Sequence, residues 1–328
     1  MSVVVTGCAG FIGAAVCARL LDAGERIIGI DEVNDSYDPS LKEWRLCRLQ
    51  EKENFVFHRV DIAEKEALFS VLDEAKHEEN ISAVINLAAR AGVRQSIERP
   101  EVYLKANITG CLHLLQWSCV NNVDKFIQAS SSSVYGSQEE QPLREDAPTD
   151  RPLSHYAASK KASELLCHSF HHLYGTDIAV LRFFTVYGPA GRPDMSIFRF
   201  IRWITEGEDV IVYGDGEQSR DFTFVQDIAD GVIKSMHVKG FEIINLGGDS
   251  PVKINRIIAM LESLLGRKCT IRRKESNPLD VRATWADISK ARKMLGWEPN
   301  THIEEGLRRT VDWYLENREW ASRICLGD

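Results

Sequence analysis

A tyrosine and a lysine four residues apart could carry out proton transfer. Tyr156 and Lys160 stand in the segment YAASK, and this spacing places them on one face of a helix. A tyrosine phenol ordinarily has a pKa of about 10 and is a poor base at neutral pH. Because a neighbouring ammonium group stabilises the phenolate and lowers that pKa, we expect Tyr156 to act as a general base with Lys160 as its partner.

Serine hydroxyls follow the predicted strand over residues 125–129. The run 130–133 consists of four serines and precedes Val-Tyr-Gly. Ligands bind at the carboxyl ends of the strands in an open α/β sheet, so one of these hydroxyls could bridge the substrate hydroxyl and the phenol. A single serine here would more simply belong to a polar turn. The combination with Tyr156 and Lys160 favours a catalytic role.

The N-terminal glycines have the spacing and context of a dinucleotide-binding loop. Gly7, Gly10 and Gly13 follow an apolar run over residues 3–5 and open a predicted helix over 11–23. Gly7 suits the tight turn, Gly10 the approach of a pyrophosphate, and Gly13 the packing of helix against sheet. The phosphates would lie at the helix N-terminus, beside Phe11 and Ile12.

Asp31 predicts which dinucleotide binds. It ends the second predicted strand, over residues 26–30. A carboxylate there accepts hydrogen bonds from the adenosine ribose and repels a 2′-phosphate, which favours NAD over NADP. We expect further cofactor contacts at the ends of the third and fourth strands and beyond, from Asp61, Ile62, Leu87, Ala88, Ala89, Asn107 and Phe184.

Apolar runs without alternation point to a parallel sheet covered on both faces. They occupy residues 3–5, 26–30, 55–60, 83–87, 125–129 and 177–182, separated by helical patterns. This is the doubly wound, Rossmann-type α/β pattern. After residue 182 the rhythm changes, and residues 183–193 are expected to form a functional loop. We predict an NAD-binding domain over 1–182 plus about 220–247, and a smaller C-terminal α/β substrate lobe over about 183–219 plus 248–328.

Composition excludes several classes of protein. The 328 residues are 44% hydrophobic and carry a net charge of −8, which argues against nucleic-acid binding. The eight cysteines form no C-x-x-C pair or Cys/His cluster, so we expect no metal site, and reduced thiols in the cytoplasm. No apolar run approaches the ~18 residues of a membrane span, and the mature chain is expected to start near Met1.

The motifs together resemble one family. The glycine loop, SSSSVYG, YAASK, LRFFTVYGP and SRDFTFVQDIADG are similar to the extended short-chain dehydrogenases/reductases, specifically the NAD-dependent epimerases and dehydratases of nucleotide sugars. The resemblance covers nearly the whole chain. Within the family, DEVNDSYDPSLKEWRLCRL, LAARAGVRQSIERPEVYLKANITG and FFTVYGPAGRPDM look most like UDP-glucuronate 4-epimerases.

The resemblance implies roles for the serines and an assembly. Ser131 takes the position of the catalytic hydroxyl, while Ser132 and Ser133 contact the sugar. NAD would be tightly bound and regenerated in each cycle. Helices around residues 100–120 and 156–174 would form a homodimer interface, although their apolar faces could equally pack internally.

The absent carboxylates bear on the reaction. Related 4,6-dehydratases carry an Asp-Glu pair at Ser132-Ser133, and related UDP-glucuronate decarboxylases commonly have an acid at Ser133. Without these bases, oxidation at C4 would be followed by rotation of the ketone and return of the hydride, a 4-epimerisation. A decarboxylase or dehydratase remains an alternative, and so does a non-catalytic NAD-binding regulator, against which Tyr156, Lys160 and Ser131 speak.

Arginines indicate a carboxylated UDP-sugar. Arg192 lies in the loop expected to cap the sugar, and a guanidinium binds a carboxylate bidentately. Thr185 replaces the asparagine of UDP-galactose 4-epimerases, so Thr185 and Arg192 are expected to hold the C6 carboxylate. A solvated loop arginine is the simpler alternative.

The resemblance also implies how UDP is held. Arg220 would pair with the diphosphate, Asp280 would contact the ribose, and Arg94 would lie beside the pyrophosphate or sugar. Asn277 stands where a second diphosphate arginine is usual, which leaves open whether Arg282 substitutes. The uracil pocket is expected to involve Ser196, Phe198, Val212 and Tyr213.

Overall fold

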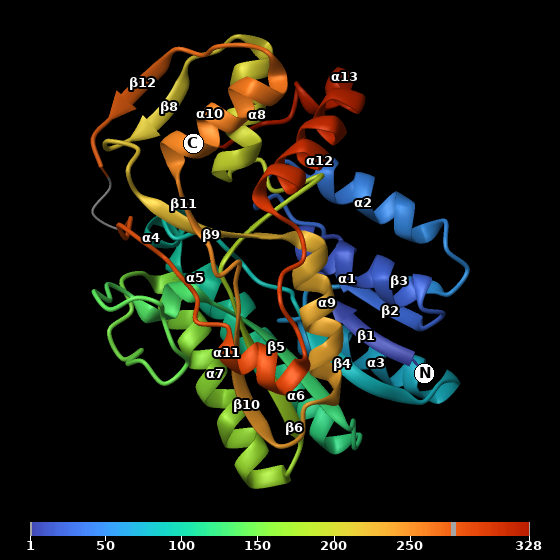
Figure 1. Ribbon diagram of the computed structural model, residues 1–328. Helices are drawn as coiled ribbons and strands as arrows, with labels where there is room; N and C mark the ends of the chain where they lie inside the picture. Colours follow the sequence, from blue (N-terminus) through green and yellow to red (C-terminus); the bar gives the residue numbers. More distant parts are fainter. Residues whose placement is uncertain (1, 277–279, 328) are drawn as a thin grey trace.

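The main sheet of the protein is parallel and doubly wound. The structure is a computed structural model, and it describes residues 2–276 and 280–327. Seven strands lie in the order β10-β6-β5-β4-β1-β2-β3 (Figure 1). They are β1 (Ser2–Thr6), β2 (Arg26–Asp31), β3 (Phe55–Arg59), β4 (Ile81–Asn86), β5 (Lys125–Ser131), β6 (Asp177–Phe183) and β10 (Phe241–Leu246). The order reverses at β1, so the crevice beside β1 and β4 is the expected ligand site.

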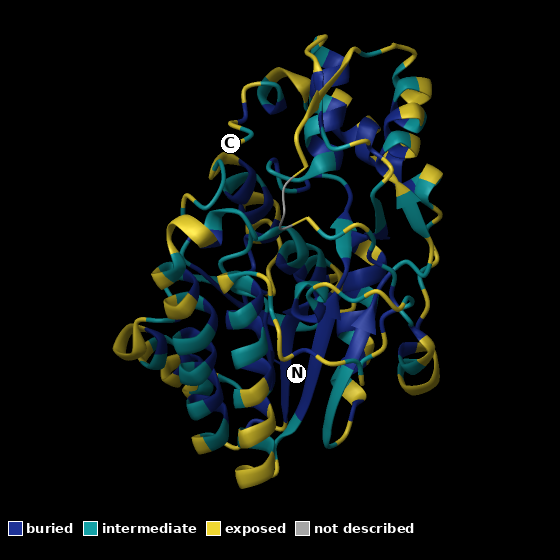
Figure 2. Ribbon diagram, turned by 90° about the vertical axis from the view of Figure 1, so that its left-hand side faces the viewer, coloured by how far each residue is buried: buried dark blue, intermediate teal, exposed yellow. Residues whose placement is uncertain are grey.

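Helices bury both faces of this sheet. Successive side chains of a strand point to opposite faces, and Val3 and Val5 pack in one core while Val4 packs in another. The first core is covered by α1 (Phe11–Asp22), α9 (Val225–Lys234) and α11 (Ser289–Leu295). The second is covered by α3 (Lys65–Glu78), α6 (Gly110–Val120) and α7 (His155–Tyr174). Figure 2 shows the strands as the most buried part of this domain. The predicted doubly wound fold is confirmed.

Further helical segments complete the main domain. They are α2 (Ser40–Gln50), α4 (Gln95–Glu98), α5 (Pro100–Leu104), the 3-10 turns η2 (Ser132–Tyr135) and η3 (Ser235–His237), and the π-helical turn η1 (Lys105–Thr109). Because η1 joins α5 directly to α6, residues 100–120 form one continuous helical segment with a wider turn in its middle.

A smaller lobe stands above the carboxyl ends of the sheet (Figure 1). It contains a three-stranded sheet in the order β11-β9-β7 and the strand pair β12-β8. The strands are β7 (Thr185–Tyr187), β8 (Val210–Tyr213), β9 (Ser219–Phe224), β11 (Pro251–Lys253) and β12 (Ile271–Lys274). The helices are α8 (Ser196–Glu206), α10 (Ile254–Leu265), α12 (Ile303–Glu316) and α13 (Arg318–Ala321).

Some boundaries differ from the sequence prediction. Ser130 and Ser131 are the last residues of β5 rather than part of a turn. The expected loop over residues 183–193 contains β7.

The chain also returns to the main domain more than once. Ile288 and Ala291, at the start of α11 and within it, are buried in the core of the main sheet. Residues 288–295 therefore pack with the domain of the glycine loop. In the ranges that the structure describes, no helix is long and apolar enough to cross a membrane.

Candidate active site

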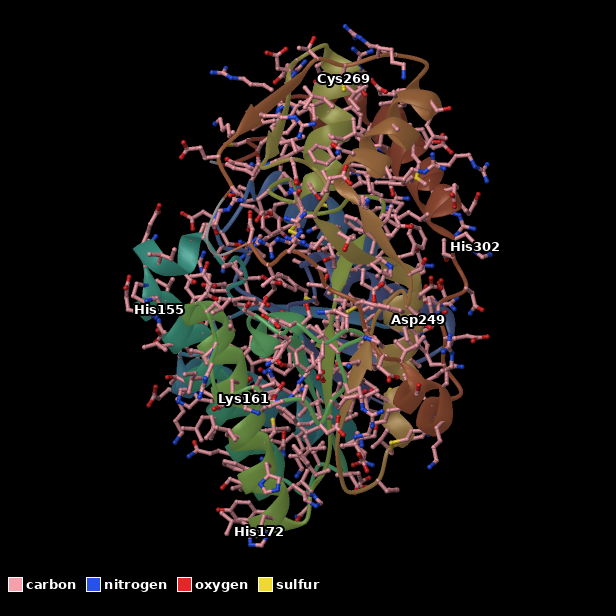
Figure 3. The ribbon with its side chains drawn as sticks, turned by 60° about the vertical axis from the view of Figure 1, so that its left-hand side comes forward. His155, Lys161, His172, Asp249, Cys269 and His302 are labelled. Carbon is pink, nitrogen blue, oxygen red and sulfur yellow. The ribbon has the colours of Figure 1, made fainter. Side chains whose placement is uncertain are left out.

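The start of α7 places Tyr156 and Lys160 at the carboxyl end of β5. Ser154 caps the helix, and its hydroxyl accepts a hydrogen bond from the backbone of Ala157 at 3.1 Å. The helix then runs past Lys161 to its last turn at His172 (Figure 3). Lys160 is buried and donates from Nζ to the carbonyl of Ala129 at 2.9 Å. Lys160 is thus anchored to the strand that carries the serines.

The pKa of the Tyr156 phenol depends on its burial and on two neighbouring groups. Burial raises the pKa of the Tyr156 phenol, whereas a hydrogen bond with Ser131 and the positive charge of Arg192 lower it. The net shift in the protein alone is upward, opposite to the expected activation, and Lys160 does not contribute to it. A further cation beside the phenol is therefore needed to favour the phenolate, and an oxidised nicotinamide is one.

Ser131 and Ser133 lie together beside this phenol. Ser131 is only 8% exposed, and its hydroxyl accepts from the backbone N–H of Ser133 at 3.1 Å. The Oγ atoms of Ser131 and Ser133 are 3.2 Å apart. Since Ser131 reaches both Tyr156 and Ser133, the structure brings together the groups predicted to act on the sugar hydroxyl.

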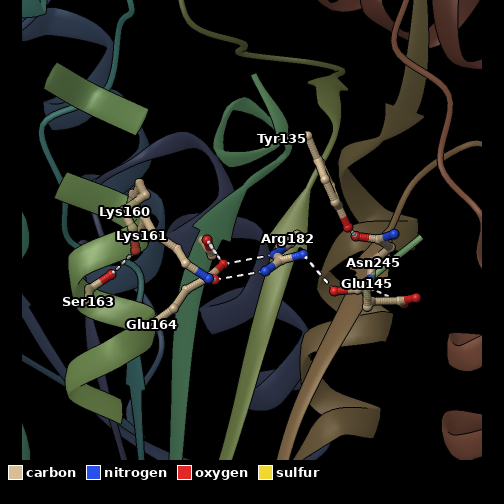
Figure 4. A network of polar contacts seen from close by, with 9 residues as sticks. Tyr135, Glu145, Lys160, Lys161, Ser163, Glu164, Arg182 and Asn245 are labelled. Atoms are coloured by element: carbon tan, nitrogen blue, oxygen red, sulfur yellow. Dashed lines mark hydrogen bonds and ion pairs between the residues drawn. The ribbon is translucent and has the colours of Figure 1, made fainter. Parts of the chain in front are cut away.

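A buried ion pair supports the same corner of the sheet (Figure 4). Arg182 on β6 donates to the Glu164 carboxylate from Nε at 2.9 Å and from Nη2 at 2.8 Å. Ser130 donates its hydroxyl to Glu164 Oε1 at 2.6 Å. Glu164 stands one turn beyond Lys160 on the same face of α7. This carboxylate therefore ties α7 to both strands that border the serines.

The arginine of this pair is held on its other side as well. Its guanidinium lies 4.8 Å from the ring centre of Tyr135 and donates to the carbonyl of Glu145 at 3.2 Å. The Tyr135 hydroxyl donates to Asn245 at 2.7 Å. Neither Glu164 nor Arg182 was predicted from the sequence, although the four-residue spacing from Lys160 to Glu164 was a signal that these two residues could share a helix face.

The glycine loop has the predicted geometry. Gly7 has φ +70°, a left-handed conformation that side chains disfavour, and a Cβ there would lie 2.7 Å from the backbone nitrogen of Ala88. A Cβ on Gly13 would overlap the carbonyl oxygen of Gly7. Both positions need glycine because the loop, the helix and the end of β4 approach one another closely.

This loop fits the pyrophosphate of a dinucleotide. Gly10 caps α1 with no side-chain hydrogen bond, and the first turn, with Phe11 and Ile12, carries no acidic residue. The backbone N–H groups there are suited to an anion. Asp31 accepts from the backbone of Ala9 at 3.1 Å and of Val33 at 2.8 Å, which places its carboxylate beside the loop. The remaining lone pairs of Asp31 suit ribose hydroxyls.

The other residues predicted to contact the cofactor lie in different surroundings. Leu87, Ala88 and Ala89 follow β4 directly, and Ala88 donates its backbone N–H to the Thr6 hydroxyl at 3.2 Å. Asp61 faces Lys105 at 3.1 Å.

Three of the predicted contacts are mainly enclosed by protein. Ile62 and Phe184 are 5% exposed. Asn107 uses its amide entirely on the protein: Oδ1 accepts from Arg90 N, and Nδ2 donates to Arg90 O and Ser159 Oγ. Asn107 thus links α7 to the loop after β4 through these hydrogen bonds.

The arginine expected to bind the sugar carboxylate already has a carboxylate partner. Arg192 donates from Nε to Asp194 Oδ1 at 3.0 Å and from Nη2 to Asp194 Oδ2 at 2.5 Å. Nη2 also donates to the carbonyl of Ala91 at 3.3 Å. The expected bidentate edge is therefore occupied within the protein. Thr185 lies nearby, on β7. The residue after it in this strand lines a small cavity together with Arg192 and Phe11.

A second arginine joins the two loops of the site. The buried Arg45 of α2 donates from Nη1 to the carbonyl of Ala9, in the glycine loop, at 3.1 Å. Its Nε and Nη2 donate to the carbonyl of Ala190, in the loop that carries Arg192, at 3.1 Å and 2.6 Å. Nothing in the spacing of the sequence indicated this link, because it joins residues 145 positions apart.

Charged side chains of the main domain and of the lobe lie close together. Arg94, after β4, donates to Asp280 at 2.7 Å and lies 4.2 Å from the ring centre of Tyr213. Burial lowers the pKa of Arg220, and the charge of Asp280 opposes that shift. Asp280 thus lies near both Arg94 and Arg220.

The remaining predicted substrate contacts are less concentrated. The Arg282 side chain is 83% exposed and stands 3.8 Å from Asp215, away from the site. Phe198 and Val212 are buried in the core of the lobe, so their side chains are committed to packing there. Ser196 begins α8. Asn277 lies outside the described residues.

Comparison with known proteins gives consistent matches over nearly the whole chain. The family model described as GDP-mannose 4,6 dehydratase matches residues 4–310. A UDP-glucuronate 4-epimerase of Thermodesulfobacterium geofontis is 53% identical over 321 residues, covering 98% of each chain.

Solved structures match in fold and length. The UDP-glucuronic acid 4-epimerase of Bacillus cereus, in complex with UDP-glucuronic acid and NAD, superimposes with a TM-score of 0.90 at 36% identity, covering 97% of this chain and 100% of that one. The UDP-glucose 4-epimerase of Thermotoga maritima, with UDP-glucose, gives a TM-score of 0.89 at 31% identity with the same coverage.

Proposed function

The chain belongs to the extended short-chain dehydrogenase/reductase family of nucleotide-sugar epimerases and dehydratases, and on that basis we propose that it converts UDP-glucuronate to UDP-galacturonate by NAD-dependent 4-epimerisation. The observation that carries the proposal is the placement of the Arg192 cation beside Tyr156, close enough to lower the pKa of the phenol. A permanent cation beside the base that acts at C4 suits a sugar with a carboxylate at C6.

The residues of the chain divide the work at C4. Tyr156 accepts the proton of the C4 hydroxyl, and Ser131 bridges that hydroxyl and the phenol. The Lys160 ammonium, fixed to Ala129, holds the cofactor ribose on the same side. The glycine loop and Asp31 hold the dinucleotide, and NAD when bound supplies a hydride acceptor at C4 that can later act as donor.

Epimerisation is the outcome that the surrounding groups favour. Ser132 and Ser133 present hydroxyls where elimination would require a carboxylate base. The 4-keto sugar is then neither dehydrated nor deprotonated at C5, and it can turn and receive the hydride on its other face. Tyr156 returns the proton, so the cycle is redox-neutral.

The sugar carboxylate also needs protection. A 4-keto uronic acid is a β-keto acid, which loses CO₂ when its carboxylate bond aligns with the carbonyl π-system. We infer that Arg192, with Thr185, holds the carboxylate out of that alignment. Because Asp194 occupies the Nε edge of Arg192, the hold is through one nitrogen rather than through a bidentate pair.

Proton NMR of the purified protein with UDP-glucuronate, without added NAD, tests the proposal. We expect a mixture of UDP-glucuronate and UDP-galacturonate, with no CO₂ and no NADH. A UDP-pentose with CO₂ would assign a decarboxylase instead, and an unchanged substrate would favour a non-catalytic NAD-binding protein.

We further infer a homodimer in the cytoplasm. Leu165 and Leu173 on α7 and Leu104 on α5 are 59%, 65% and 48% exposed, an apolar surface on adjoining helices. All eight cysteines are unpaired in the described residues, which suits a reducing compartment. Sedimentation of the wild type against a Leu165→Glu variant tests the dimer, which the variant should dissociate.

A further inference from the structure

We propose that Asp194 determines how firmly the substrate carboxylate is held, by sharing Arg192 with it throughout the reaction. This inference rests on the proposed function. In it, Asp194 is a specificity-determining residue that touches neither C4 nor the cofactor. It acts through the guanidinium of Arg192.

The hydrogen bonds of Arg192 leave one nitrogen for a ligand. Nε and Nη2 both donate to Asp194, and the second N–H of Nη2 is used by the carbonyl of Ala91. Across residues 2–276 and 280–327, the structure records no hydrogen bond from Nη1. A carboxylate of the sugar would therefore meet Nη1, while Asp194 keeps the opposite edge.

The loop around Arg192 is fixed, so the guanidinium does not turn freely. Ala190 has φ +51°, and Arg45 holds its carbonyl with two nitrogens. The side chains of Arg192 and Asp194 are only 19% and 14% exposed, so water screens their charges weakly. The direction in which Nη1 points is thus set by the protein before substrate arrives.

Charge balance explains why a second carboxylate is useful. Burial alone would lower the pKa of Arg192, and the charge and hydrogen bonds of Asp194 raise it instead. Without Asp194, the sugar carboxylate would be the sole counter-charge of a weakly solvated cation, and such pairs are hard to break. Asp194 removes that dependence.

The reaction needs the carboxylate to move. C5, which bears the carboxylate, is bonded to C4, so both travel when the 4-keto ring turns its other face to the hydride. A carboxylate held too firmly before the turn stabilises the starting arrangement more than the turning one, and the barrier rises. Because Asp194 remains on Arg192, the sugar can leave Nη1 without exposing an unpaired buried charge.

Asp194→Asn separates this role from scaffolding. We expect the dissociation constant of UDP-glucuronate, measured calorimetrically with NAD present, to fall about tenfold, since removing one like charge is worth a coupling of that order. The kcat for UDP-glucuronate should fall, whereas the dissociation constant of UDP-glucose, whose sugar has no carboxylate, should stay within about twofold. Weaker binding of both sugars, or no change for UDP-glucuronate, would overturn the inference.

Two further variants keep the test decisive. Asp230→Asn makes the same charge change in a surface pair with Arg19 and should leave both dissociation constants unchanged. Asp194→Glu retains the carboxylate and should keep UDP-glucuronate binding near that of the wild type, which also decides the matter if the asparagine variant does not fold. The turnover of the wild-type protein is a separate test, of the proposed function. Epimerisation of UDP-glucose but not of UDP-glucuronate would refute that function, whatever effect Asp194 has on binding.

Discussion

Glu164 and Arg182 form an ion pair in which both side chains are 1% exposed, and its carboxylate stands one helical turn from Lys160 (Figure 4). The pair is placed so that a change in its charge reaches Lys160 directly. It also fixes Ser130, the residue before Ser131.

The pH dependence of activity should therefore respond to Glu164. Burial lowers the pKa of Lys160 to about 8, and Cys111, Glu164 and Cys167 act against that shift. In Glu164→Gln the lysine loses a raising contribution, so it loses its proton at a lower pH. We expect the alkaline limb of kcat against pH to move to lower pH.

Arg182→Met provides the opposing variant for this profile. It removes the main partner of Glu164, which leaves more uncompensated negative charge near Lys160. The alkaline limb should then move to higher pH. Shifts in the same direction for both variants would show that the pair acts only through packing.

The same ion pair should contribute measurably to the free energy of unfolding. Breaking a buried ion pair by removing one partner costs about 3–5 kcal/mol, so Arg182→Met should lower the free energy of unfolding by that order. The double variant with Glu164→Gln should cost less than the sum of the two single variants. Additive effects in chemical unfolding would contradict a direct interaction.

Acid should weaken the contribution of this carboxylate. Burial acts to raise the pKa of Glu164, but Arg182 and Ser130 lower it below its ordinary value. A depressed folded-state pKa adds stability above the unfolded pKa of about 4.3, and that stability is lost as pH falls further. The stability difference between wild type and Glu164→Gln should thus shrink in acid; a difference independent of pH would argue against an ionised Glu164.

Asp31 should control the choice of dinucleotide. Asp31→Ala removes the acceptor beside the glycine loop and the negative charge that opposes a 2′-phosphate. We expect the dissociation constant of NAD to rise about tenfold, in line with the loss of charge-assisted hydrogen bonds, and NADP to bind better than it does to wild type. Fluorescence titration with both dinucleotides measures this, and an unchanged preference would remove Asp31 from the ribose site.

Substitutions of Arg94 and of Arg45 should affect the binding of NAD and of the UDP-sugar differently. Arg94 contacts Asp280 and Tyr213, so Arg94→Met should weaken UDP-sugar binding and leave NAD binding unchanged. Arg45 contacts the loops of both sites, so Arg45→Met should weaken both ligands. Calorimetric titrations check this contrast, and equal effects of the two variants on NAD would contradict it.

Local patterns predicted the elements and motifs that are short in sequence. The glycine loop, Asp31 at the end of β2 and the Tyr156–Lys160 pair depend on spacing within one strand or one turn, and these were readable. The parallel, doubly wound sheet was also predictable, because strands without alternation require helices on both faces.

Long-range partners were not readable in the same way. Arg45 meets Ala190 only because two domains fold together, and Arg182 meets Glu164 only because β6 pairs with β5. The Arg192–Asp194 pair was close in sequence, yet an arginine among glycines and prolines gives no sign of which edge of its guanidinium is free. Phe198 and Val212 were predicted at the uracil because the position of the lobe's core was unknown.

The fate of a label at C4 tests the central claim most directly. UDP-glucuronate carrying deuterium at C4 should give UDP-galacturonate that keeps the deuterium at C4, because the hydride removed is the hydride returned after the ring turns. The product should gain no deuterium at C4 when unlabelled substrate reacts in heavy water. Loss of the label to solvent, or its appearance in a UDP-pentose, would contradict a redox-neutral 4-epimerisation at Tyr156.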